Sequence, residues 1–145
     1  MSRKYFPFYN LDSAVGPHAP NRQADVMLVQ FFLRELARDQ TVAPQTRPKS
    51  PITVDGMYGP SLGQWILWFQ NAMNAKRPGG TLADGRVDPA RGTYLDKSSI
   101  SRTQYTIVGL NASYRSRYKT SHDALENDTR VPPVLRAKFT EDDYV

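Results

Sequence analysis

Cysteine is absent from the 145 residues, and only two histidines and three glutamates are present. The absence of cysteine excludes disulfides, thiolate metal sites and cysteine nucleophiles. The histidines, His18 and His122, are too far apart in the sequence to suggest the organised ligand set of a zinc peptidase. The glutamates, Glu35, Glu126 and Glu141, are dispersed, whereas a glycosidase needs two carboxylates beside one bond. We therefore predict that the protein is not an enzyme and needs no metal ion or cofactor.

Long apolar segments are also missing. No stretch approaches the roughly 18 consecutive apolar residues that a membrane span requires, and the first residues contain no apolar run of signal-peptide length. The sequence thus predicts a soluble product made in the cytoplasm, with a virion or an exported particle as alternative destinations. The net charge of +5, from 19 Lys+Arg and 14 Asp+Glu, would suit anionic partners in general without selecting one class.

Two segments have the hydrophobic spacing of amphipathic helices. The first covers residues 21–39, with Asn21 or Asp25 as the candidate cap of its start. The second covers residues 60–74 and is followed by a Pro-Gly-Gly break. In both, apolar side chains recur at spacings of three and four residues. They are Val26, Val29, Phe32, Leu33 and Leu36, then Leu62, Ile66, Phe69 and Met73 with Trp65 and Trp68 on either side.

A turn signal occurs twice, each time in the frame D-G-x-x-[GD]-P. Glycine accepts a positive φ and the aspartate carboxylate can bond nearby amides, while proline suits the first position of a helix. We predict that each copy is a structural turn that starts a helix, the second near Pro89 with Tyr94 and Leu95 on it. The lack of a closing glutamate after Asp84 argues against a calcium loop. The turn residues are Asp55, Gly56, Gly59, Pro60, Asp84, Gly85 and Pro89.

The two ends of the chain have weaker patterns. Residues 1–14 are predicted to form an extended arm whose aromatic side chains pack either on this domain or on a neighbouring chain; they are Tyr5, Phe6, Phe8 and Tyr9. Residues 99–145 are predicted to be partly helical. Their helical spacing involves Tyr105, Val108, Ala112 and Tyr118, and a last helical turn is expected over residues 134–139.

Several motifs follow one another in a fixed order between residues 15 and 95. A V-x-x-[LV]-Q-x-x-L helix precedes D-G-x-[FY]-G-P, which leads into an [IV]-x-x-F-Q helix and then a second D-G. The counterparts are Val26, Val29, Gln30 and Leu33; Asp55, Gly56, Tyr58, Gly59 and Pro60; Ile66, Phe69 and Gln70; and Asp84 and Gly85. This combination resembles the peptidoglycan-binding-domain-like family.

The resemblance implies a mostly α fold, with a small three-helix orthogonal bundle over residues 15–98 between the arm of residues 1–14 and the extension of residues 99–145. The expected common core consists of Val29, Leu33, Ile66, Phe69 and Leu95. Three features depart from the family pattern: a longer loop at residues 40–51, Trp65 where alanine is common, and Asp88 where glycine is usual.

For function, the resemblance implies a non-catalytic module that binds peptidoglycan or muropeptides. A receptor for such ligands needs polar donors beside an aromatic surface. The candidate residues are Tyr58, Trp65, Trp68, Gln70 and Asn71. For any single one of them, a packing or docking role is favoured over ligand contact.

Two other functions remain as alternatives. In the first, the protein is an architectural component of a phage particle or contractile injection device, in which residues 1–14 and 99–145 contact other subunits or a second copy. In the second and weaker one, Arg115, Arg117 and Lys119 bind nucleic acid together with neighbouring tyrosines. A solvated basic helix face is favoured over nucleic-acid binding.

Overall fold

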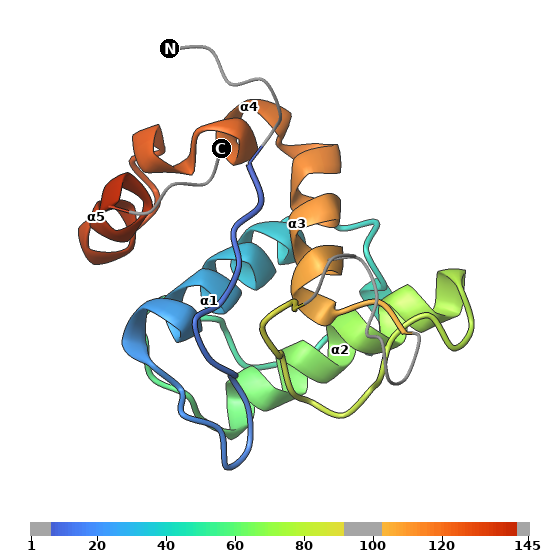
Figure 1. Ribbon diagram of the computed structural model, residues 1–145. Helices are drawn as coiled ribbons and strands as arrows, with labels where there is room; N and C mark the ends of the chain where they lie inside the picture. Colours follow the sequence, from blue (N-terminus) through green and yellow to red (C-terminus); the bar gives the residue numbers. More distant parts are fainter. Residues whose placement is uncertain (1–6, 92–102, 142–145) are drawn as a thin grey trace.

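The computed structural model describes residues 7–91 and 103–141, and this part of the chain is mostly helical (Figure 1). The α-helices are α1 (Gln23–Ala37), α2 (Pro60–Lys76), α3 (Thr106–Arg117), α4 (Lys119–Asp123) and α5 (Pro133–Glu141), with 3₁₀ turns at Pro44–Thr46 and Leu125–Asn127. Among the described residues there is no strand, only an isolated antiparallel bridge between Val15 and Val87. None of the helices in this part is long and apolar enough to cross a membrane.

Helix α1 is the centre of the molecule. It packs against α2, α3 and α5, and 11 of its 15 residues are buried. The predicted stripe from Val26 to Leu36 is confirmed as buried, but Leu28 and Phe31 outside that stripe are buried as well. The ring of Phe31 lies 5.7 Å from that of Tyr114 in α3. The C-terminal third of the chain therefore covers a face of α1 that a three-helix module alone would expose.

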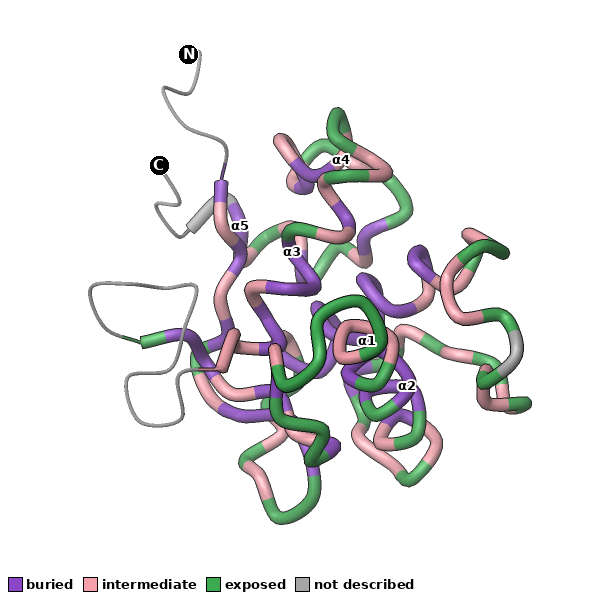
Figure 2. Tube along the Cα trace, turned by 90° about the vertical axis from the view of Figure 1, so that its right-hand side faces the viewer, coloured by how far each residue is buried: buried purple, intermediate pink, exposed green. Residues whose placement is uncertain are grey.

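One hydrophobic core extends from Tyr9 to Phe139 and draws residues from all parts of the chain. Buried residues concentrate where the helices face one another, and the outer loops are mostly exposed or intermediate (Figure 2). Four residues of the predicted core belong to it, namely Val29, Leu33, Ile66 and Phe69. The fifth, Leu95, lies outside the described residues.

The described part of the N-terminal arm is packed into the fold. Tyr9 is fully buried, and its hydroxyl donates to the carbonyl oxygen of His122 at 2.7 Å. The Tyr9 backbone N–H donates to Asn111 Oδ1 at 2.9 Å, and its ring lies 4.8 Å from Phe139. Of the two outcomes expected for these aromatics, Tyr9 thus packs on its own chain, against the C-terminal extension. Tyr5 and Phe6 lie outside the described residues.

The C-terminal extension is attached to α1 by charge as well as by apolar contact. Glu35 of α1 is fully buried and accepts a hydrogen bond from Arg130 at 2.6 Å. Arg34 and Arg38 also lie within 3.1 Å of its carboxylate. A buried carboxylate needs such partners because desolvation of an unpaired charge is costly.

The predicted cap of the first helix is wrong. The residue that precedes α1 is Arg22, and no side chain caps the helix. Asn21 has a positive φ of 50°, and its side chain instead closes a short loop by accepting from Gly16 N–H at 2.8 Å. Asp25 accepts from the backbone N–H groups of Asp12 and Ser13. Both side chains are therefore used to hold the incoming chain rather than the helix end.

The helix expected to start near Pro89 does not begin there, because residues 89–91 are not helical. The segment is instead held against the N-terminal chain. Val87 exchanges two backbone hydrogen bonds with Val15, at 2.8 and 2.9 Å. The Asn10 side chain bonds both the N–H and the C=O of Ala90 at 2.9 Å. Tyr94 lies outside the described residues.

His122 in α4 is a buried histidine surrounded by aromatic rings. It is 1% exposed, with ring centroids of Tyr9, Phe32 and Tyr114 5.1 to 6.3 Å away. Its Nε2 bonds Asn111 Oδ1 at 2.9 Å. Burial lowers the pKa of His122 to about 4, so the imidazole is neutral at pH 7.

We predict that this histidine makes the fold sensitive to mild acid. Because the unfolded histidine has a pKa near 6.5, the unfolded state binds more protons between about pH 6.5 and pH 4. Stability is therefore complete above that window and declines through it, by about 3 kcal/mol. Urea unfolding at several pH values measures the loss. His122→Phe should show a flatter profile in this window, whereas His18→Asn, at an exposed position, should behave as the wild type. Parallel profiles for His122→Phe and the wild type would contradict the prediction.

Candidate functional site

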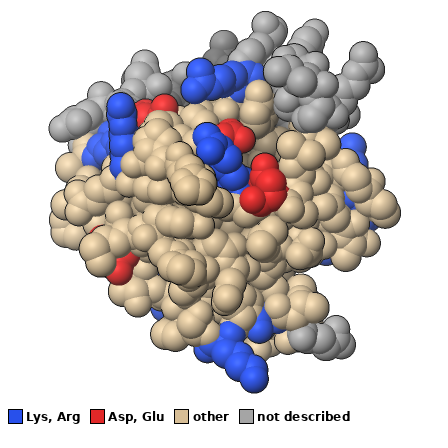
Figure 3. Space-filling model, turned by 90° about the horizontal axis from the view of Figure 1, so that it is seen from below, with Lys and Arg blue, Asp and Glu red and all other residues tan. Residues whose placement is uncertain are grey.

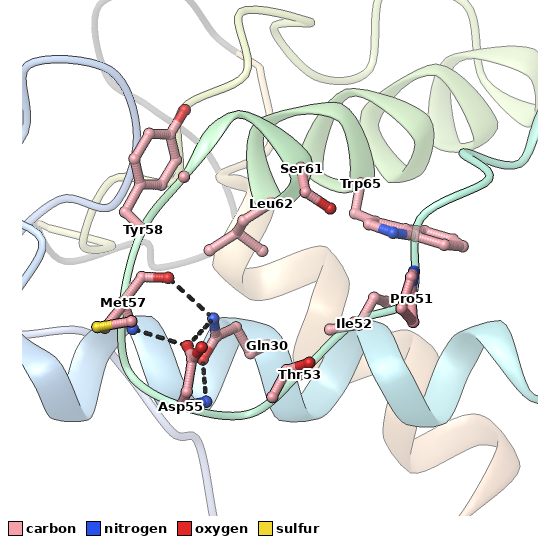
Figure 4. Close-up of a pocket in the computed structure, with 11 residues that line it drawn as sticks. Gln30, Pro51, Ile52, Thr53, Asp55, Met57, Tyr58, Ser61, Leu62 and Trp65 are labelled. Carbon is pink, nitrogen blue, oxygen red and sulfur yellow. Dashed lines mark hydrogen bonds between the residues drawn. The ribbon is translucent and has the colours of Figure 1, made fainter.

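Each Asp-Gly turn is held by the side-chain amide of a buried glutamine. At the first turn, Gln30 Oε1 of α1 accepts from the backbone N–H groups of Asp55 and Gly56, at 3.0 and 2.9 Å. Its Nε2 donates to Asp55 Oδ1 at 2.9 Å and to the carbonyl of Met57 at 3.1 Å (Figure 4). The turn needs glycine because Gly56 has a φ of 76°.

The second turn has the same construction. Gln70 Oε1 of α2 accepts from Gly85 N–H at 2.9 Å. Its Nε2 lies within 3.3 Å of Asp84 Oδ1 and 3.0 Å of the carbonyl of Arg86, and also bonds Thr106 Oγ1 at 3.0 Å. The φ of Gly85 is 74°. The repeated turn signal therefore corresponds to a repeated structure in which a helix glutamine closes the turn.

A pocket opens beside the first turn, between the loop of residues 51–59 and the start of α2 (Figure 4). Its volume is about 280 Å³. It has apolar walls, hydroxyl groups and a single charged side chain, Asp55. The lining residues are Gln30, Pro51, Ile52, Thr53, Asp55, Met57, Tyr58, Gly59, Ser61, Leu62 and Trp65.

Asp55 gives this pocket a fixed negative charge. The hydrogen bond from Met57 N–H, and after it that from the Gln30 amide, hold the pKa of the Asp55 carboxyl below its usual value. Both bonds go to Oδ1. In the described part of the chain, no hydrogen bond goes to Oδ2. This oxygen therefore has no hydrogen-bond donor from the described chain.

The structure brings only two of the five candidate ligand residues to this pocket, Tyr58 and Trp65. Gln70 is fully buried, and its amide is used by the second turn. Trp68 is 3% exposed and packs edge-to-face on Trp65 at 5.2 Å. Asn71 is exposed on α2 but does not line the pocket. The expectation that Gln70 offers its amide to a ligand is therefore corrected, because that amide already has protein partners.

The tryptophans hold the long loop of residues 40–51 against α2. The indole N–H of Trp65 donates to the carbonyl of Ser50 at 2.9 Å, and that of Trp68 to the carbonyl of Ala43 at 3.1 Å. Arg47 lies over the Trp68 ring at 5.4 Å and donates to carbonyl groups at the end of α1. The long loop and Trp65, both noted in the sequence, thus contact each other directly.

The basic candidates of the C-terminal region are paired with carboxylates. Arg115 and Lys119 bond Asp123 at 2.8 and 3.1 Å, and Arg117 bonds Asp39 at 2.8 Å. On the face seen in Figure 3, lysines and arginines are scattered among uncharged and acidic side chains and form no continuous basic surface. Within residues 7–91 and 103–141, no three His, Asp or Glu side chains gather as a metal site.

The site residues that sequence reasoning missed are Gln30, as the clamp of the first turn, and Asp55, as the pocket's charge. The sequence did contain a signal for the role of Gln30, because Gln30 ends the V-x-x-[LV]-Q motif just as Gln70 ends the F-Q motif. Comparisons with family models, with curated proteins and with solved structures give no match.

We predict that the two glutamine clamps contribute similarly to stability. Gln30→Ala and Gln70→Ala each leave buried backbone N–H groups without an acceptor, and each should lower the free energy of unfolding by about 2–4 kcal/mol. The control is Gln64→Ala at an exposed position of α2, which should change it by less than about 0.5 kcal/mol. Urea unfolding measures all three. Losses at Gln30 and Gln70 no larger than at Gln64 would show that the turns hold without their clamps.

Proposed function

We propose that the protein is a non-catalytic module that binds peptidoglycan, with the pocket beside the first Asp-Gly turn as its site. We also propose that α1, α2 and the two clamped turns form the peptidoglycan-binding-like part of the fold. The observation that carries the proposal is the open pocket next to the D-G-x-[FY]-G-P motif, with Tyr58 and Trp65 among its lining residues. The motif that contributes to the resemblance and the pocket thus lie at the same place in the fold.

The chemistry of the pocket suits a wall fragment. Half-buried Ile52 offers apolar surface that can contact a sugar face or an acetyl methyl group, whereas Leu62 and Trp65 line the pocket but are only 5% and 6% exposed. Thr53 contributes a hydroxyl, and Asp55 a carboxylate that accepts hydrogen bonds from amide or amino groups. Peptidoglycan carries all of these groups within a short distance. No catalytic group is needed for such a contact, which is consistent with a binding role.

One feature of the structure favours the architectural alternative. An apolar groove of about 190 Å³ lies between residues 41–43, the C-terminal half of α2 and α3. It could receive a neighbouring subunit. The arm, in contrast, supports this alternative less than expected, because residues 7–14 are engaged with their own chain. The nucleic-acid alternative receives no support from Arg115, Arg117 and Lys119, whose charges are already paired.

We predict that purified sacculi retain the protein in a sedimentation assay and that filling the pocket abolishes retention. Thr53 is an exposed lining residue, so Thr53→Tyr should occupy the cavity at little cost to the fold and weaken binding at least about tenfold. Thr120→Tyr makes the same change at an exposed position of α4 and should bind as the wild type. Trp68 and Gln70 are unsuitable for this test because both are buried structural residues.

Salt separates specific binding from charge attraction. Retention through the pocket should persist as the salt concentration rises from about 0.05 to 0.5 M, whereas attraction of a basic protein to an anionic wall is screened in that range. Failure of sacculi to retain the wild type even at the lowest salt would exclude the proposed function. Equal retention of Thr53→Tyr and Thr120→Tyr would exclude the pocket as the site.

A further inference from the structure

The two clamped turns differ in what lies next to them. Counted from the aspartate, the fourth residue of the second turn is Val87, whose backbone N–H and C=O both bond Val15, at 2.8 and 2.9 Å. The chain itself thus places one extended residue beside the second turn. This is the pairing of a short antiparallel bridge.

The equivalent residue of the first turn is Tyr58, and no described segment makes the matching pair of backbone hydrogen bonds to it. Among the described residues, its backbone N–H and C=O make no hydrogen bond, and the same holds for Ile52, Thr53 and Val54. Of these four residues, Ile52, Thr53 and Tyr58 line the pocket, on the two sides of its loop (Figure 4). Backbone groups of this kind are strong donors and acceptors that favour a partner.

We propose that an extended peptide, a stem peptide of the cell wall, takes the place beside Tyr58 that Val15 takes beside Val87. The peptide exchanges backbone hydrogen bonds with Tyr58 and places an amino group near Asp55. This inference rests on the proposed wall binding and specifies which part of the wall is recognised, namely the peptide rather than the glycan.

A peptide fits this place better than a sugar for two reasons. A peptide residue carries one N–H and one C=O in the arrangement that the reciprocal pair requires, as in the addition of a strand to an exposed edge. The only charge in the pocket lining is the carboxylate of Asp55, which attracts an ammonium group. Stem peptides that contain a diamino acid supply such an ammonium group.

The direct test is amide hydrogen exchange by NMR, with stem peptides that have been released enzymatically from the glycan. Addition of the peptide should slow exchange of the Tyr58 N–H at least about tenfold at saturation. The internal control is the Val87 N–H, which is already bonded to Val15 and should change little. Peptide that binds in the pocket without slowing exchange at Tyr58 would overturn the proposed pairing.

Two matched substitutions test the charge. Asp55→Asn keeps an oxygen to accept from Met57 and Gln30, so the turn is retained while the negative charge is lost. It should weaken peptide binding about tenfold. Asp84→Asn is the same change at the second turn, where Oδ1 accepts from Arg86 N–H at 3.0 Å, and should leave peptide binding unchanged. Equal affinities for the two variants would contradict the role of Asp55.

Competition against sacculi separates this inference from the proposed function. Free stem peptides should displace the protein, and glycan chains stripped of peptide should not. Displacement by glycan alone would leave wall binding intact and overturn the peptide inference. If sacculi do not retain the protein but the free peptide protects Tyr58, wall binding fails while peptide pairing stands.

Discussion

Hydrogen bonds between a buried glutamine and an Asp-Gly turn fix the path of the chain at two places. Gln30 and Gln70 each satisfy backbone groups of a turn that reverses the chain beside a helix. Without these amides, the turns would bury unpaired N–H groups, which is costly in a small core. The clamps also fix where the loop of residues 51–59 lies, and hence where the pocket opens.

The two Asp-Gly turns are held in the same way but have different surroundings, because the rest of the chain packs differently on each. Residues 9–15 and α3 fold over the second turn, where Val15 and Thr106 complete its hydrogen bonds. Nothing in the described chain covers the first turn in the same way, so a negatively charged pocket remains there. On a chain of net charge +5, this pocket is a local exception. The partner chemistry is therefore better judged from the pocket than from the overall charge.

Parts of the fold with a local signal were predictable. The periodicity of Val29, Leu33, Ile66 and Phe69 located both long helices and much of the core, because a helix repeats every 3.6 residues whatever surrounds it. The Asp-Gly pairs located both turns. The predicted cap of α1 was wrong because the Asn21 side chain instead accepts a hydrogen bond from Gly16 in the preceding loop. The choice between these two uses of the Asn21 side chain leaves no periodic pattern in the sequence.

A reader of the amino-acid sequence alone finds a mostly helical chain, two matched turns and no cysteine chemistry. The roles of Gln70 at a turn, of Trp65 and Trp68 under a long loop, and of Asp55 in an open pocket emerge from the folded chain. The two kinds of information differ in how far along the chain the interactions reach. Helix periodicity and turn chemistry act between residues a few positions apart, whereas the partner of Gln30 lies 25 residues away and is chosen by the packing of the whole chain.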